Sequence, residues 1–282
     1  MNLLFAILLG GLTSSLYALS TSLQALEARR SSTTTALRAS LLRGLVRRPL
    51  WLAGTAAGLI AWPIQALALS LASVEVVQPA LGLGLIVLLV LGVRLLRERV
   101  GVREVGAAVA IATAIAALGW ASPPATATFT RGGQVAIAAL LGLAAAAPYL
   151  LRIFGRAGGL ATSVSAGLAW AAVGLATAVI DSSLADRHWL AALAWAAGVA
   201  VAGWSGLLSE MTALQTWPAT RSIPVVFGLE MSLPAALAPI LTLARPAHLL
   251  TFGAALAVAV AAAGLLGSSR AVAHAAHPLT AP

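Results

Sequence analysis

The stretch Ser209–Ile240 reads SEMTALQTWPATRSIPVVFGLEMSLPAALAPI and differs from the long runs of Ala, Leu, Val and Gly on either side of it. It holds Glu210, Arg221 and Glu230 together with four prolines. Glu230 lies about ten residues inside an apolar segment, which puts it near the middle of a bilayer. A charge at that depth costs roughly 2.5–3.5 kcal/mol on insertion scales, so it needs a partner, a water-filled cavity or a proton. We therefore expect this stretch to be the working part of a multi-span membrane protein.

The overall composition is that of a membrane protein. The 282 residues are 60% hydrophobic and 9% charged, with a mean hydropathy of +0.97, whereas a soluble domain carries about 25% charge. Continuous apolar runs of about 20 residues can each cross a bilayer as a helix, and they lack the alternation over ~10 residues that marks a transmembrane β-barrel. The sequence therefore predicts an all-α polytopic bundle, with 1–282 forming one integral membrane domain in contact with the lipid bilayer.

Nine apolar segments are predicted to span the membrane. They are Asn2–Ser20, Trp51–Ser70, Val76–Arg94, Val105–Trp120, Gln134–Leu151, Leu160–Ile180, Trp189–Ala213, Thr220–Leu243 and His248–Gly267. Between the first two, residues 25–50 carry several Arg on one face of a helical apolar pattern, which favours an amphipathic helix on the membrane surface. A tenth span within 25–50 is the alternative. In the second span, Gly54 and Gly58 form a GxxxG pattern that permits close helix approach.

The distribution of Arg predicts the orientation in the membrane. The net charge of +9 comes from 17 Arg and no Lys, and these Arg lie in short loops between apolar runs. We interpret them as topology signals of the positive-inside rule rather than as a nucleic-acid surface. With nine spans the N-terminus is outside a cell (inner) membrane, and the C-terminus, with a short tail at 269–282, is cytoplasmic. The chain has no Cys, which excludes disulfides and thiolate metal sites, and no metal or cofactor is expected.

The two halves of the chain echo each other. Ala68–Pro79 and Ala213–Pro224 align without gaps at a shift of 145 residues, and each joins two predicted spans. The first junction is predicted outside and the second inside, so the halves, about 1–121 and 133–268, have opposite orientations. That is the inverted-repeat plan of many secondary transporters. A chance alignment of two Ala- and Leu-rich hairpins is the alternative.

Three stretches carry a resemblance to a known superfamily: RRPLWLAG at 47–54, ALALSLASVEVVQPALGLGL at 66–85 and ATRSIPVVFGLEMSLPAALAP at 219–239. They are similar to motifs of the drug/metabolite transporter (DMT) superfamily, whose EamA-type members have paired five-helix repeats. A basic loop after a single N-terminal span is more similar to the NIPA-type magnesium transporter branch. The resemblance implies transport of a small metabolite or, for the NIPA-like branch, of a divalent cation.

The candidate site residues centre on Glu230. A carboxylate at membrane depth could bind a cationic substrate or cycle a proton, and the alternative is a protonated Glu bonded to a neighbouring helix. Glu210 and Arg221 flank the junction between the seventh and eighth spans, where they predict either an interfacial salt bridge or a gate. Pro234 and Pro239 should break the helix and free carbonyls near Glu230.

Other candidates lie elsewhere along the predicted pathway. Glu75, Gln78 and Gln65 could line an external vestibule. The mid-span residues Trp62, Trp170 and Trp204 could form an aromatic wall, or they could simply pack. Pro79 and Pro224 are the helix breaks at the two aligned junctions.

These features predict a secondary transporter for a small metabolite or drug-like solute, proton-coupled by alternating access. The alternatives are a divalent cation (Mg²⁺) transporter or channel, which would need about six oxygen ligands, and a non-transporting accessory protein. We do not expect an enzyme, because no DxxD or His–Asp cluster appears in any loop. A homodimer is a possible assembly.

Overall fold

The computed structural model describes residues 2–71, 74–121, 129–156, 158–242 and 246–268. These residues form ten α-helices and one short 3-10 helix. Their bounds are α1 Asn2–Arg29, η1 Thr33–Thr35, α2 Ala39–Leu45, α3 Pro49–Leu71, α4 Val74–Arg94, α5 Val102–Ala121, α6 Arg131–Ile153, α7 Gly159–Ala185, α8 Trp189–Thr216, α9 Ala219–Thr242 and α10 Leu249–Ser268.

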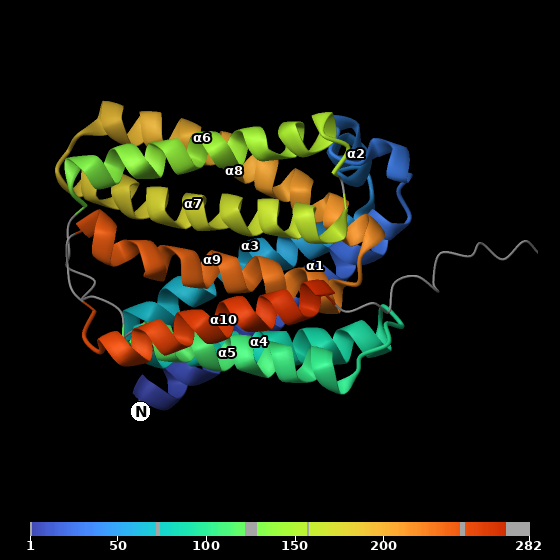
Figure 1. The fold of residues 1–282 in the computed structure, drawn as a ribbon, viewed down its shortest axis with the longest axis horizontal. Coiled ribbons are helices and arrows are strands. Elements are labelled where there is room, and N and C mark those ends of the chain that lie inside the picture. The colour runs from blue at the N-terminus through green and yellow to red at the C-terminus, as the bar shows by residue number, and fades with distance from the viewer. Residues whose placement is uncertain (1, 72–73, 122–128, 157, 243–245, 269–282) are drawn as a thin grey trace, which may run out of the picture.

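The long helices lie side by side and reverse direction from one to the next along the chain (Figure 1). Most described Arg therefore gather at one end of the bundle, which we call the Arg-rich end. They are Arg29, Arg30, Arg38, Arg43, Arg47, Arg48, Arg94, Arg97, Arg99, Arg103, Arg152, Arg156 and Arg221. Arg131 and Arg187 lie at the opposite end. The bundle thus has the lopsided charge that the loop pattern predicted.

The helices are those of a membrane-embedded bundle. Seven of them, α1 and α5 to α10, are long and apolar enough over the described residues to cross a membrane. In α4 the described stretch Ala80–Arg94 is a shorter apolar helix. The positions of α3 and α4 coincide with the predicted second and third spans, and the count of nine spans stays a prediction.

Residues 25–50 do not form a tenth span. They hold the end of α1, the turn η1 and the seven-residue helix α2, and seven residues of helix cover only about 10 Å. Helix α2 buries Leu41, Leu42 and Leu45 and exposes Arg43, so the predicted amphipathic character is confirmed. Helix α2 takes up only part of the predicted region 25–50. The start of that region belongs to α1, which continues through TSLQALEAR to Arg29, a sequence rich in helix-forming residues.

The segment after α1 is docked on the protein. The Leu37 amide donates to Thr212 Oγ1 of α8 at 3.0 Å. The leucines of α2 join a buried apolar cluster at the Arg-rich end, which we call the end cluster. Its buried members are Ala25, Ala28, Leu41, Leu42, Leu45, Trp51, Leu96, Leu208, Met211, Leu214 and Ala219. Trp51, at the start of α3, is 4% exposed and donates to Met211 Sδ at 3.4 Å.

Glycines allow the closest helix contacts. A Cβ at Gly54 of α3 would lie 2.8 Å from the Ser20 carbonyl oxygen of α1, and one at Gly58 would lie 3.0 Å from Ser20 Oγ. The close approach predicted from GxxxG is therefore confirmed. Gly167 of α7 plays the same part against α9, where a Cβ would lie 3.0 Å from the Val226 carbonyl oxygen.

Candidate functional site

A cavity of about 400 Å³ lies inside the bundle among α1, α3, α4, α7, α8 and α9. This volume is within the range of about 300–1,000 Å³ that is typical of small-molecule pockets. Its polar lining is Ser14, Tyr17, Ser20, Thr21, Gln24, Thr55, Gln65, Trp170, Glu210 and Glu230. The apolar lining includes Leu59, Leu81, Leu85, Leu88, Val226, Phe227 and Met231. The site thus combines a mainly apolar wall with a few polar groups.

Two carboxylates from adjacent helices face this cavity. Glu210 lies in the last part of α8 and Glu230 near the middle of α9. Glu210 is 9% exposed, and its Oε2 accepts a hydrogen bond from Trp170 Nε1 at 2.8 Å. Glu230 lines the same cavity as Glu210, and so does Tyr17 of α1. The cavity wall therefore carries two carboxyl groups from neighbouring helices.

Neutral hydrogen bonds join α1 to α3 along the cavity wall. The Tyr17 hydroxyl donates to Gln65 Oε1 at 3.1 Å. Gln24 Nε2 donates to Thr55 Oγ1 at 3.3 Å. These pairs fix polar side chains of α1 and α3 in the wall of the cavity that Glu210 and Glu230 also line.

Helix α9 continues without interruption through Pro224, Pro234 and Pro239. The predicted helix breaks at Pro224, Pro234 and Pro239 are therefore wrong, because the turns on either side of each proline stay helical. The prolines still remove backbone donors. Since Pro234 has no N–H, the carbonyl of Glu230 lacks its usual partner four residues on. A polar backbone group is thus freed at the level of the cavity acid.

The end cluster borders the cavity at the Arg-rich end. Leu207 and Ile223 both line the cavity and pack against the end cluster. Around the same end lie three carboxylates whose side chains are no more than 7% exposed, those of Glu27, Glu98 and Glu104. Each of them is paired with Arg.

Glu104 pairs with Arg221 and so joins α5 to α9. Arg221 donates to Glu104 Oε1 from Nη2 at 2.7 Å and from Nε at 3.1 Å. The other oxygen of Glu104 accepts the Gly101 amide at 2.9 Å. Both side chains of the ion pair are 7% exposed. The pair is therefore a buried link between the starts of two helices.

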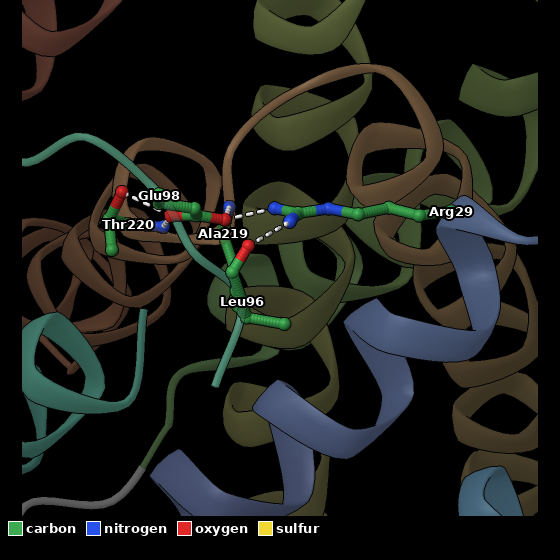
Figure 2. Close-up of polar contacts among 5 residues, drawn as sticks. All are labelled: Arg29, Leu96, Glu98, Ala219 and Thr220. Atoms are coloured by element: carbon green, nitrogen blue, oxygen red, sulfur yellow. Dashed lines mark hydrogen bonds and ion pairs between the residues drawn. The ribbon is translucent and has the colours of Figure 1, made fainter. Parts of the chain in front are cut away.

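Glu98, in the loop between α4 and α5, ties three segments together (Figure 2). It accepts the amides of Ala219 and Thr220 at 2.7 and 2.9 Å, and also the Thr220 hydroxyl. Arg29 at the end of α1 donates to Glu98 and to the Leu96 carbonyl. The first turn of α9 has no acid of its own, so Glu98 supplies the capping carboxylate that the helix N-terminus favours.

Glu27 holds the chain on either side of α2. One of its oxygens accepts from Arg30 at 2.8 Å and the other from Arg48 at 2.9 Å. Together with the Glu98 and Glu104 contacts, this pairing fastens α1, α3, α5 and α9 at the Arg-rich end.

The structure brings together four of the predicted site residues and separates others. Glu230, Glu210, Gln65 and Trp170 line the cavity. Trp62 and Trp204 are 69% and 44% exposed, so they lie outside it. The side chains of Glu75, Gln78 and Pro79 lie outside the described part of the chain, as does the tail 269–282. Pro224 is buried in the first turns of α9.

The predicted ion pair between Glu210 and Arg221 is wrong. Arg221 pairs with Glu104, and Glu210 accepts from Trp170. The reason is that the two residues belong to different helices: Glu210 points to the cavity from α8, while Arg221 lies at the start of α9 beside α5.

Sequence reasoning missed Tyr17, Gln24 and Thr55 in the cavity and the roles of Glu98 and Glu104 outside it. Tyr17, Thr21 and Gln24 follow one another at intervals of four and three residues, so they form a polar stripe on one face of α1. A helical projection of α1 could have found this stripe. No local pattern identifies Glu98 as a cap, because the helix that it caps begins more than 100 residues later.

The donor set does not form a metal centre among the described residues, where no three His, Cys, Asp or Glu side chains come together. No known protein family matches the chain, and neither does any curated protein or solved structure.

Proposed function

We propose that this chain is a multi-pass secondary transporter that moves a small metabolite or drug-like solute by alternating access. The observation that carries the proposal is the cavity of about 400 Å³ inside the bundle, with two carboxylates in its wall and a packed apolar cluster bordering one end. Transporters bind substrate near the middle of the membrane between helices that rearrange. The sequence resemblance to the DMT superfamily supports the same function.

The helix arrangement supports two inverted halves. A shift of 145 residues carries the end of α3 at Leu71 to the end of α8 at Thr216, and the start of α4 at Val74 to the start of α9 at Ala219. Helix α1 packs on α3 and α4 as α7 packs on α8 and α9. In this proposal α6 has no counterpart in the first half, which gives nine spans in place of ten. Alternating access is then a rocking of 1–121 against 133–268.

The Arg-rich end is cytoplasmic in this proposal, following the positive-inside rule. The N-terminus then lies on the outer side of the cell (inner) membrane. It follows that the end cluster and the three paired acids lie on the cytoplasmic side of the cavity.

Proton coupling is assigned to the cavity acids. Carboxylates in a mainly apolar cavity are stabilised when a proton or a positively charged group joins them, and Glu210 and Glu230 lie in such a cavity. A divalent cation substrate, as in the NIPA-like alternative, would need carbonyls and waters to complete about six oxygen ligands.

Purified protein in liposomes that contain a trapped pH dye tests the function. Pools of metabolites and, separately, Mg²⁺ are added to wild type, Glu230→Gln and Asp186→Asn. Asp186 is an exposed acid at the end of α7 and serves as the control. We expect substrate-dependent proton flux in wild type and in Asp186→Asn, and loss of that flux in Glu230→Gln.

Two other outcomes would contradict the proposal. Mg²⁺ uptake without proton movement would favour the cation transporter. No flux of any pool through correctly folded wild type would favour the accessory protein.

A further inference from the structure

The buried acids of this chain fall into two groups. At the Arg-rich end, each of Glu27, Glu98 and Glu104 has an Arg within ion-pair distance. This is the usual condition for a buried charge, because an unpaired one is strongly unfavourable in a medium of low dielectric constant. These three acids therefore have structural partners inside the chain.

The two cavity acids have no such partner among the described residues. The lining of the cavity contains no Arg and no His, and its charged groups are Glu210 and Glu230. Glu210 is nine-tenths buried and accepts its hydrogen bond from Trp170 on Oε2, which leaves Oε1 for a ligand. No hydrogen bond or ion pair to the Glu230 carboxylate is found in the described part of the chain. The cavity thus holds two carboxyl groups, and its lining offers them no fixed counter-charge.

The rest of the lining matches an apolar body attached to a cation. Leu81, Leu85 and Val226 offer an aliphatic wall, and the rings of Tyr17, Trp170 and Phe227 lie in the same lining. Aromatic faces attract ammonium groups, most strongly where water is excluded. The neutral acceptor and donor groups of Ser14, Thr21 and Gln65 could bind further polar atoms of the same molecule.

A bare divalent metal ion fits this lining less well. Hard cations take about six or more oxygen ligands, and no three acidic or His side chains come together in the described residues. The apolar and aromatic groups would be left facing a strongly hydrated ion. An organic cation uses both the acids and the apolar wall.

We infer that the cavity binds a small organic amine in its cationic form, with Glu230 as the main counter-charge and Glu210 and Trp170 beside it. This inference rests on the proposed function for the idea that the bound molecule is transported, but binding itself does not depend on transport. The ammonium group donates to the carboxylate oxygens, and the apolar part of the amine packs against the leucines and rings.

The test compares three probes of the same shape and different charge, which are phenethylamine, 2-phenylethanol and phenylacetate. Binding to the purified full-length chain in detergent micelles is measured by isothermal titration and by quenching of tryptophan fluorescence. A charge-assisted contact is stronger than a neutral one, so we expect wild type to bind the amine at least about tenfold more tightly than the alcohol. Phenylacetate should bind most weakly.

Glu230→Gln should reduce the preference for the amine over the alcohol by about tenfold. Glu210→Gln should also reduce it, while the affinity for the alcohol stays unchanged. Asp186→Asn, the control, should bind all three probes as wild type does. The comparison of probes on wild type needs no variant, so the inference remains testable if one of the cavity variants fails to fold.

Equal affinity of wild type for amine and alcohol would overturn the inference. So would an unchanged amine preference in both Gln variants, or full displacement of the amine by an equal concentration of MgCl₂. Failure of the inference and failure of the proposed function are distinguishable. Proton flux driven by a neutral solute, in a protein that does not bind amines, would support the proposed transport and contradict the amine site. Selective amine binding without any flux would support the amine site and contradict the proposed transport.

Discussion

The buried ion pair between Arg221 and Glu104 offers a direct measure of what holds α9 in place. Arg221→Met removes the charge and keeps a long apolar side chain, and Glu104→Gln removes the opposite charge and keeps the shape. The two variants and their combination form a double-mutant cycle. In the first variant Glu104 keeps the Gly101 amide as a partner but loses both of its bonds from Arg221.

The structure sets the magnitude. Removal of one partner of a buried ion pair costs about 3–5 kcal/mol. The Arg221 and Glu104 side chains are each 7% exposed, but they lie in the first turns of α9 and α5 rather than deep in the bundle. We therefore expect Arg221→Met to lower the free energy of unfolding by about 3 kcal/mol, the lower end of that range. The double variant should lose less than the sum of the single variants, with a coupling of roughly 1–3 kcal/mol.

Unfolding in mixed detergent and SDS micelles, followed by fluorescence of the eight tryptophans, provides the assay. The control is Arg30→Met, which breaks a contact of 2.8 Å between Arg30 and Glu27. Arg30 is 61% exposed and Glu27 keeps Arg48, so this loss should stay below about 1 kcal/mol. The reasoning is refuted if Arg221→Met costs no more than Arg30→Met, or if the losses of the cycle are simply additive.

Three further predictions follow from other contacts. Glu98→Gln weakens the cap of α9 and the contact with Arg29, so it should cost about 2–3 kcal/mol and speed amide exchange at Ala219 and Thr220; unchanged exchange there would argue against a capping role. Gly167→Ala places a Cβ 2.7 Å from Leu229 Cβ and 3.0 Å from the Val226 carbonyl oxygen, so it should lower the free energy of unfolding by about 1–3 kcal/mol. The control Gly174→Ala in the same helix meets nothing within 4 Å and should be neutral or stabilising by up to about 1 kcal/mol. Equal thermal stabilities of the two variants would contradict the close contact between α7 and α9. The native chain has no Cys, so single substitutions report orientation: an impermeant maleimide on intact cells should label Ala185→Cys and not Ser40→Cys, and the reverse pattern would invert the proposed topology.

The bundle was predictable because membrane insertion leaves a strong signal along the chain. A run of about 20 apolar residues has few ways to satisfy its backbone in lipid other than a helix, and the predicted spans coincide with long helices throughout the described residues. Local glycine spacing also predicted a close helix approach at Gly54, but only the structure identifies α1 as the partner. The extension of α1 to Arg29 was less visible, because Gln24 and Glu27 lower the hydropathy there although they are good helix formers.

The cavity acids were predictable for a related reason, since an acid within an apolar span is costly wherever it lies. The partners were not predictable. Arg221 has two acids nearby in the sequence, Glu210 and Glu230, but the acid that it pairs with in space is Glu104. Trp62, Trp170 and Trp204 have similar positions along their spans, yet the direction in which each helix faces leaves Trp170 at the cavity and the other two at the surface. Tertiary contacts decide which charged residues pair and which face of a helix points to the cavity, and the hydrophobic periodicity of the sequence does not specify those contacts.

Helix α9 connects the two parts of the site mechanically. Its first turn carries Ala219, Thr220 and Arg221, which bind Glu98 and Glu104 at the Arg-rich end, and its middle carries Glu230 in the cavity. A helix transmits displacement along its axis unless its hydrogen-bond ladder is weakened, and Pro224 and Pro234 weaken it on either side of the stretch that leads to Glu230. Any rearrangement that opens the cavity toward the Arg-rich end must therefore either break the contacts of Glu98 and Glu104 or bend α9 at these prolines. Stability measurements on the Glu98 and Glu104 variants, made with and without a cavity ligand, distinguish contact breakage from bending of α9. Only if the contacts break should the stabilisation by the ligand depend on Glu98 and Glu104.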